Sequence, residues 1–144
     1  MKTQAKPFLK WAGGKSQLLC QFEKYYPDDL SKGSIDKYIE PFVGGGAVFF
    51  EIIQKYNIPH SYICDINKDL ILTYLVIQKK SDVLLDFLEK YQIDYNHTNE
   101  HGRKNMFLFV REIFNEKRSE ISHKMFSENW ILRAAQFIFL NKTC

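Results

Sequence analysis

A glycine-rich segment near the start of the chain carries residue types suited to binding a small ligand. The segment Phe8–Ser16 reads FLKWAGGKS and places the indole of Trp11 and the ammonium of Lys15 on either side of two glycines. Glycine lets the backbone approach a ligand closely. An aromatic face beside a cation suits a small ligand that has an aromatic part and an anionic end.

Two other interpretations of this segment stay open. Gly14, Lys15 and Ser16 match the end of a phosphate-binding P-loop, but that motif requires a glycine five residues before Gly14, where Leu9 stands. The second interpretation is structural: a glycine-rich helix start with the Lys15 side chain in solvent.

A second motif, Tyr38–Ala47, reads YIEPFVGGGA and lies between an expected strand and an expected helix. Glycines at the carboxyl end of the first strand let the backbone close on a ligand where open α/β sheets bind nucleotides. A dinucleotide-binding enzyme is disfavoured, because Phe49 occupies the place of the third glycine of that fingerprint, counted from Gly44. A plain tight turn is the structural alternative.

The third motif, Tyr62–Asn67, reads YICDIN and places Asp65 at the end of a second expected strand. An acidic residue about 20 residues beyond a glycine turn can accept hydrogen bonds from both ribose hydroxyls of a bound nucleoside. Alternatively, Asp65 caps the helix that begins near Asn67. The occurrence of all three motifs in one chain favours the ligand site.

The elements that must position these motifs form one βαβ unit. Apolar and β-branched spacing predicts strands over 37–43 and 61–65 with a helix over 47–56 between them. Two parallel strands joined in this way require a right-handed crossover. A further helix is predicted over 16–26, directly after the first glycine pair. The fold class is therefore α/β.

From Asn67 onward the apolar spacing is helical throughout. One helix is expected to end before Ser81, where another begins. The polar stretch 94–104 is predicted to be a loop, followed by a helix over 106–115. Ser127 is expected to cap a final, strongly apolar helix.

The composition describes one folded domain's worth of chain. The 144 residues are 45% hydrophobic, 15% aromatic and 26% charged, with a formal charge of +3, which argues against disorder. No apolar run reaches the roughly 18 residues that cross a bilayer, and no signal peptide is present, so we expect a soluble cytoplasmic protein without membrane contact.

The cysteines and the basic residues exclude other classes of function. Cys20, Cys64 and Cys144 lack C-x-x-C spacing and the histidines are scattered, so neither a disulfide framework nor a metal site is expected. Cys64 stands in an apolar run and is expected to be a small buried residue. The basic residues form no stripe, so strong DNA binding by this chain alone is not expected.

Two features predict that the chain is a piece of a larger α/β protein. Two strands are fewer than the roughly four to six of a usual sheet. The last residues, 137–144, are apolar and lack the polar tail expected at a surface terminus.

The three motifs resemble those of the N6-adenine-specific DNA methyltransferases of the Dam and DpnII type, the D12 class. The resemblance rests on FLKWAGGK at 8–15, EPFVGGG at 40–46 and DIN at 65–67. The segments 107–115 and 133–142 resemble the helical stretches that precede and begin the target-recognition region of that family. The similarity covers almost the whole chain.

This resemblance implies a Rossmann-like S-adenosylmethionine-dependent methyltransferase fold with an incomplete sheet. Residues 1–93 would be the N-terminal part of the cofactor-binding domain, and 94–144 the truncated helical start of the target-recognition region. The cofactor would be S-adenosylmethionine and the partner double-stranded DNA, with Lys10 lying toward the DNA. The implied cofactor-binding residues are Trp11, Ala12, Gly13, Lys15, Phe42, Gly44 and Asp65.

The resemblance also implies what is missing. The family flips the target adenine out of the duplex and binds its amino group with an Asp-Pro-Pro-Tyr motif, which occurs nowhere in these 144 residues. We therefore expect an N-terminal portion of a restriction-modification methyltransferase, with GATC as the leading target, that has no catalytic residue of its own and is inactive alone. Alternatives are a non-catalytic S-adenosylmethionine-binding or regulatory module, one half of a split enzyme whose second chain carries the motif, and a P-loop nucleotide hydrolase.

Overall fold

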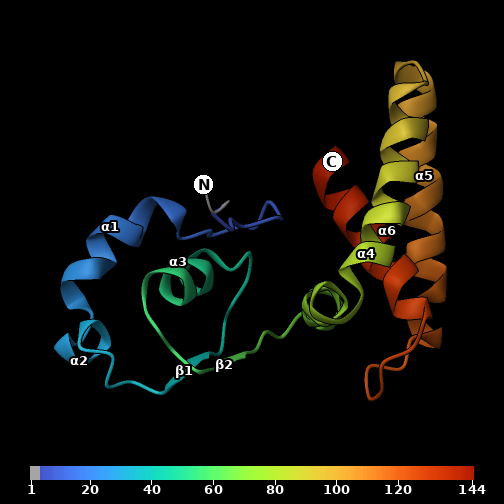
Figure 1. Ribbon diagram of the computed structural model, residues 1–144. Coiled ribbons are helices and arrows are strands. Elements are labelled where there is room, and N and C mark those ends of the chain that lie inside the picture. Colours follow the sequence, from blue (N-terminus) through green and yellow to red (C-terminus); the bar gives the residue numbers. More distant parts are fainter. Residues whose placement is uncertain (1–3) are drawn as a thin grey trace. The chain divides into compact units, whose positions relative to one another are not determined.

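The computed structural model describes residues 4–144, and the chain divides into two compact units. The first unit ends at Ile66 and the second spans Asn67–Cys144 (Figure 1). The functional division expected at residue 94 stays a prediction, because it concerns the roles of the segments rather than their packing. Within residues 4–144, no helix is long and apolar enough to span a membrane.

The first unit has the βαβ order that the sequence predicts. Short helical pieces come first, and a strand, a helix and a second strand follow. In chain order the elements are the 3₁₀ turn Ser16–Leu18, α1 (Leu19–Phe22), the 3₁₀ turn Glu23–Tyr25, α2 (Asp28–Ser31), β1 (Lys37–Glu40), α3 (Ala47–Lys55) and β2 (His60–Ile63). The single helix predicted over 16–26 is broken into three pieces. No residue of these pieces is buried, and short helices without a packed face gain little stability.

The two strands are parallel, as predicted, and both are shorter than predicted. Lys37 pairs with His60 and Ile39 with Tyr62. β1 ends at Glu40 because the next residue, Pro41, has no N–H to donate to the ladder. The pairing nevertheless continues beyond the strands, since the N–H of Cys64 donates to the carbonyl of Glu40 at 2.8 Å.

The amino-terminal segment of the unit is held on α3 by one side chain. The Ala5 N–H donates to Oε1 of Gln54 at 2.6 Å, and Nε2 of Gln54 donates to the Ala5 carbonyl at 2.9 Å. These reciprocal bonds imitate the pairing of two peptide groups. They anchor the segment that leads into the glycine pair at Gly13.

The two faces of the small sheet differ. Tyr38 and Glu40 share one face, because side chains alternate along a strand. On the other face the side chains of Ile39 and Tyr62 are 65% and 54% exposed. Cys64 is also exposed, so the prediction of a small buried cysteine is wrong. The apolar run around Cys64 belongs to a strand that only one layer of the unit covers.

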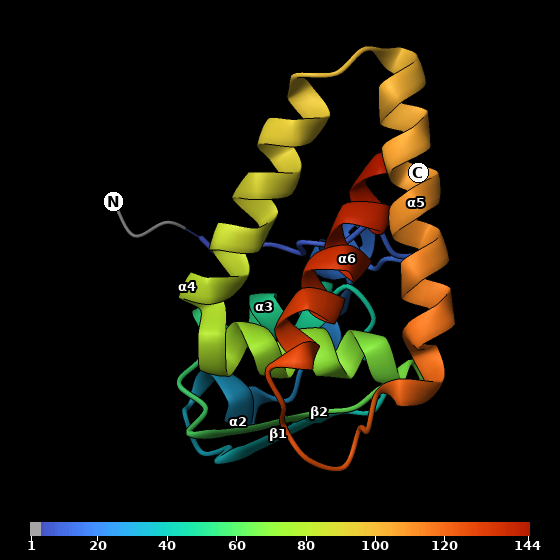
Figure 2. The same ribbon diagram turned by 90° about the vertical axis from the view of Figure 1, so that its right-hand side faces the viewer.

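The second unit is entirely helical in its regular structure. Its elements are α4 (Lys68–Asn96), α5 (Glu100–Glu116), a 3₁₀ turn (Lys117–Glu120) and α6 (Asn129–Thr143). Figure 2 shows α6 between α5 and the second half of α4. Lys80 has non-helical backbone angles (φ −147°, ψ 43°) that kink α4, which confirms the predicted change of helix at Ser81.

The polar stretch at 94–104 was predicted to be a loop, and this prediction is wrong. α4 continues to Asn96 and α5 already begins at Glu100. The side chain of Asn99 accepts a hydrogen bond from the Gly102 N–H at 2.9 Å and caps α5. The polar residues of this stretch therefore lie on helix ends rather than in a long loop.

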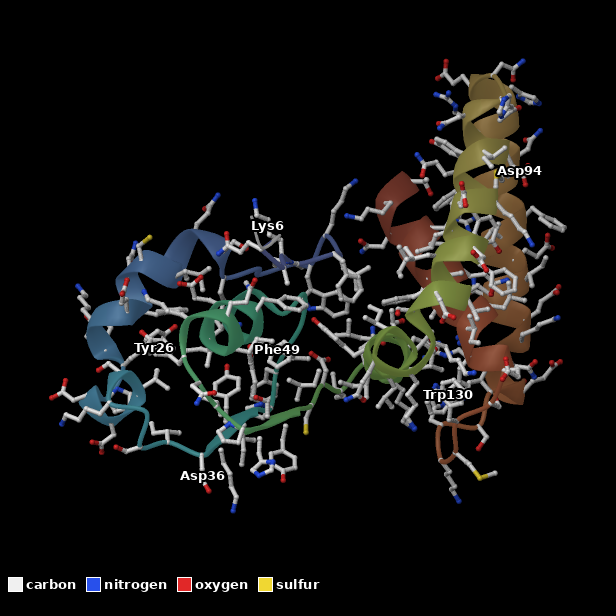
Figure 3. The ribbon with its side chains drawn as sticks, in the orientation of Figure 1. Lys6, Tyr26, Asp36, Phe49, Asp94 and Trp130 are labelled. Carbon is white, nitrogen blue, oxygen red and sulfur yellow. The ribbon has the colours of Figure 1, made fainter. Side chains whose placement is uncertain are left out.

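Ser127 does not cap α6 with its side chain, contrary to the prediction. The helix begins at Asn129 and has no side-chain cap. The carbonyl of Ser127 instead accepts a hydrogen bond from the N–H of Trp130 at 3.0 Å. The Trp130 indole lies in the first turn of α6 (Figure 3) and donates to the Ser122 carbonyl at 2.9 Å.

A buried arginine joins the helices of this unit. Arg133 on α6 is 2% exposed. Its Nε and one terminal nitrogen donate to the two carboxylate oxygens of Asp69 on α4, at 2.6 and 3.0 Å. The other terminal nitrogen donates to the Phe114 carbonyl on α5 at 2.8 Å. The guanidinium also lies 3.9 Å from the centroid of the Phe114 ring, a cation–π contact.

We expect Arg133→Met to lower the free energy of unfolding by about 3–5 kcal/mol, because the largely buried Asp69 carboxylate loses both hydrogen bonds from the guanidinium and keeps the His123 ring nitrogen at 3.7 Å. Urea unfolding followed by circular dichroism measures this change. Arg118→Met, at an exposed position, is the matched control and should change stability by about 0.5 kcal/mol or less. A loss below about 1 kcal/mol for Arg133→Met would contradict the assignment.

Candidate functional site

A cavity of about 280 Å³ opens where both strands of the first unit end. Glu40 is the last residue of β1, and Asp65 lies two residues beyond the end of β2. The carboxyl ends of parallel strands are where open α/β sheets bind ligands. All seven residues expected to bind a cofactor line this cavity: Trp11, Ala12, Gly13, Lys15, Phe42, Gly44 and Asp65. Lys10, expected to lie toward DNA, is exposed and is not among the lining residues.

The indole of Trp11 packs on the glycine backbone of the second motif. A Cβ atom built on Gly44 would lie 2.7 Å from Cδ1 and 3.0 Å from Nε1 of Trp11. Gly44 also has a φ of +50°, which side chains rarely adopt. On Gly45, a Cβ atom would lie 3.3 Å from Cβ of Trp11. The absence of a side chain at Gly44 is thus required for the contact between the two motifs, and a side chain at Gly45 would crowd it.

The first glycine pair forms a turn rather than a phosphate loop. The Gly14 N–H donates to the Trp11 carbonyl at 3.0 Å, and Gly13 has a φ of +72°. A P-loop follows a strand and opens a full helix. Here residues 4–11 contain no strand, and the glycine turn leads into a three-residue 3₁₀ turn at Ser16 and the four-residue helix α1 rather than a full helix. The local geometry therefore does not support the P-loop interpretation.

Asp65 holds the turn between β1 and α3. Its Oδ2 accepts a hydrogen bond from the Gly44 N–H at 3.0 Å. It does not cap α4: that role belongs to Asn67, whose side-chain oxygen accepts from the Leu70 N–H at 3.1 Å. The capping interpretation of Asp65 is therefore wrong, because the side chain that caps α4 comes two residues later.

The mouth of the cavity combines an exposed aromatic ring with a cation. Phe42 is 73% exposed, although the glycines that follow it are buried. A large exposed ring beside a cavity supplies apolar surface that a flat ligand can cover. Lys15, on the glycine-pair side of the cavity, is also exposed. Among the described residues no group of three histidine, cysteine or acidic side chains could hold a metal ion.

Sequence reasoning missed the role of Glu40, whose carboxylate lines the same cavity. The hydroxyl of Tyr38 donates to Oε2 of Glu40 at 2.7 Å. Burial raises the pKa of the Glu40 carboxyl, whereas the Tyr38 hydroxyl, the Lys15 ammonium and the Phe49 backbone amide all act to lower it. Burial, together with this same hydrogen bond, raises the pKa of the Tyr38 hydroxyl. The alternation of side chains along a strand could have indicated this pair, because it puts Tyr38 and Glu40 on one face of the sheet.

Comparison with known proteins gives the family. The model of the D12 class N6 adenine-specific DNA methyltransferases matches residues 11–144. The chain belongs to this family.

Several relatives with known names are similar to almost the whole of this chain. The Type II methyltransferase M.MjaIII of Methanocaldococcus jannaschii is 45% identical over 141 residues, which are 98% of this chain and 46% of the relative. The DNA N-6-adenine-methyltransferase of Escherichia phage P1 is 35% identical over 94% of this chain and 15% of its own length. The DNA adenine methylase of Vibrio cholerae is 28% identical over 99% of this chain and 42% of its own. The chain thus spans less than half the length of each of these relatives.

Gly44→Ala should be more destabilising than Gly33→Ala. Both glycines have positive φ, +50° and +70°, so both variants carry backbone strain, but a Cβ atom meets Trp11 only at Gly44 and nothing within 4 Å at Gly33. Overpacking of this kind costs about 1–3 kcal/mol. We expect that difference between the two variants in urea unfolding.

A Trp11→Ala background tests the cause. Once the indole is removed, Gly44→Ala and Gly33→Ala should lower the free energy of unfolding by nearly the same amount. Equal effects already in the native background would show that the indole contact does not constrain Gly44.

Proposed function

We propose that this chain forms the S-adenosylmethionine-binding portion of a site-specific DNA adenine methyltransferase with a Rossmann-like core. The observation that carries the proposal is the convergence of three separated sequence motifs on one cavity at the strand ends. Family membership supports the reaction class. The cavity, about 280 Å³, is at the lower end of ligand-site volumes, which suits one part of the cofactor with the remainder exposed or covered by further chain.

The residues of the cavity suit the parts of S-adenosylmethionine, which supplies an activated methyl group on a sulfonium. Asp65 would accept hydrogen bonds from the ribose hydroxyls. Trp11 and Phe42 offer the apolar surface that an adenine requires. Lys15 would attract the methionine carboxylate as a point charge, and Gly44 would let the backbone approach. Ala12 and Gly13 complete the wall on the side of the first motif.

Methyl transfer itself needs groups that these 144 residues do not contain. The adenine amino group is a poor nucleophile, and the family resemblance implies that an Asp-Pro-Pro-Tyr motif binds the flipped base. The chain has four prolines and no two are adjacent. We propose that Lys10 contributes a DNA contact, to a base edge or a phosphate, and that GATC is the target.

The exposed face of the small sheet is expected to be covered by further protein. Ile39 and Tyr62 expose large apolar surfaces on the face opposite Tyr38 and Glu40. Sheets in α/β proteins are covered on both faces. Further protein that carries the catalytic motif, on the same or on a second polypeptide, would cover this face.

The direct test of cofactor binding is calorimetric titration of the 144-residue chain with S-adenosylmethionine. We expect binding, and a loss of about tenfold or more in affinity for Asp65→Asn, because a hydrogen-bonded charge is removed. Asp36→Asn is the matched control: Asp36 precedes β1, at the strand end away from the cavity (Figure 3). No heat of binding at protein concentrations far above micromolar would refute the proposal.

An assay of methyl transfer distinguishes an incomplete methyltransferase, a split enzyme and a regulatory module. With tritiated S-adenosylmethionine and adenine-containing duplex DNA, we expect no incorporation by this chain alone. Incorporation that appears after a chain with the Asp-Pro-Pro-Tyr motif is added would establish a split enzyme. Binding of cofactor without any restored transfer would favour a regulatory module. Robust transfer by the chain alone would overturn the view that it is catalytically incomplete.

A further inference from the structure

A segment without regular secondary structure forms one wall of the cavity. Residues 4–11 contain no helix or strand, yet Pro7, Leu9 and Trp11 line the cavity. Such a segment has no ladder of hydrogen bonds to fix its backbone. The strap, residues 5–11, must therefore be positioned by other contacts.

The strap is fixed on α3 at both of its ends. At the carboxyl end, the Trp11 indole packs on Gly44 and Gly45, which come just before α3. At the amino end, Ala5 is bonded to Gln54, one residue before α3 ends. The strap thus lies beside α3 (Figure 1), with its two ends at opposite ends of that helix.

The side-chain amide of Gln54 makes three hydrogen bonds. Its Oε1 accepts from the Ala5 N–H at 2.6 Å, and its Nε2 donates to the Ala5 carbonyl at 2.9 Å. The same Nε2 donates to the Phe50 carbonyl at 2.6 Å, one turn back along α3. An amide nitrogen has two donors, so both are used. The bond to Phe50 fixes the side chain for its contact with the strap.

Packing contributes little at the amino end of the strap. Ala5 and Lys6 are exposed, and a cavity of about 220 Å³ lies beside Ala5, Lys6 and Pro7. Gln54 lines this second cavity, but not the cavity of the candidate site. The hydrogen bonds of Gln54 therefore hold the amino end, and any effect on the candidate site passes through the strap.

Bonding to both backbone groups of one residue also sets the register of the strap. A slip by one residue would move the strap along α3 by about 3.3 Å. A slip by two would bring Pro7 to Gln54, and Pro7 has no N–H to donate. Either shift would carry Trp11 away from its place on Gly44.

We propose that Gln54 is a positioning residue for cofactor binding, because it fixes the strap in the register that places Trp11 in the cavity wall. It acts through the strap and does not touch the ligand. The inference rests on the proposed function, in which Trp11 offers apolar surface to the adenine of S-adenosylmethionine. Apparent affinity falls with the fraction of molecules that have the strap in place. A loosened strap therefore weakens binding without removing any ligand contact.

The first test measures the affinity of two variants for S-adenosylmethionine by calorimetric titration. Gln54→Met removes all three hydrogen bonds and keeps the helix propensity of the side chain. Gln54→Glu keeps the shape but replaces the donor to the Ala5 and Phe50 carbonyls by a carboxylate oxygen. We expect either exchange to weaken binding about threefold to tenfold. Gln78→Met, at an exposed position on α4, is the matched control and should change the affinity by less than about twofold.

Hydrogen exchange followed by mass spectrometry separates positioning from a general loss of stability. In Gln54→Met, the amides of residues 4–11 should exchange about threefold to tenfold faster, because the strap opens more easily. The amides of β1 and β2 should keep their native rates. Equal acceleration throughout the first unit would show that Gln54 only stabilises the fold, and the inference would then be wrong.

Quenching of tryptophan fluorescence by acrylamide reports the position of the indole without any ligand. Trp130 is only 3% exposed, so the quenchable emission comes mainly from Trp11. The quenching constant should rise in Gln54→Met and stay at the native value in Gln78→Met. An unchanged constant in Gln54→Met would show that Gln54 does not place the indole.

Failure of the proposed function and failure of the inference give different results. If the native chain does not bind S-adenosylmethionine, the cofactor site is refuted and the inference fails with it. If the native chain binds and Gln54→Met binds equally well, the inference alone is refuted. Weaker binding in both Gln54 variants, with faster exchange confined to residues 4–11, supports it.

Discussion

The contact between the Trp11 indole and the backbone at Gly44 and Gly45 is the constraint on which the candidate site depends. The two segments are separated by more than thirty residues, and they can meet at this distance only because neither glycine carries a Cβ. The Asp65 carboxylate holds the Gly44 amide from the other side. One glycine therefore connects all three motifs, and the cavity exists because these contacts are satisfied together.

The charges of the cavity follow from the ends of the secondary structure. Glu40 stands where Pro41 ends β1, and its carboxylate reaches the backbone amide of Phe49 in the first turn of α3. Gly46, which precedes that helix, has no side chain with which to cap it. The carboxylate therefore stabilises the amino terminus of α3, because helix amino termini favour negative charge.

The arrangement of the helices in the second unit depends on a buried charged side chain. Arg133 bonds to Asp69 on α4 and to the Phe114 carbonyl on α5, and its guanidinium covers the Phe114 ring. Such an arrangement contributes less net stability than an apolar core of equal volume. It fixes instead how three helices meet, since an arginine has donors in a rigid fork and can satisfy them in few geometries.

The sequence by itself determined the family motifs, the βαβ order and seven of the residues that line the cavity. The motifs are local signals: glycines, an indole, a lysine and an aspartate at fixed spacings. The strand–turn–helix order brings their positions to one edge of the sheet. It also determined the kink near Ser81. These features depend on short-range chemistry that a linear pattern preserves.

Only the tertiary structure decided the rest. The exposure of Cys64 depends on which face of the sheet is covered, and the helical state of 94–104 depends on a cap at Asn99 and on neighbouring helices. The orientation of Glu40 into the cavity required the position of α3, and the burial of Arg133 required three helices together. In each case the deciding partner is distant in sequence or is a backbone group, and residue types along the chain do not reveal such partners.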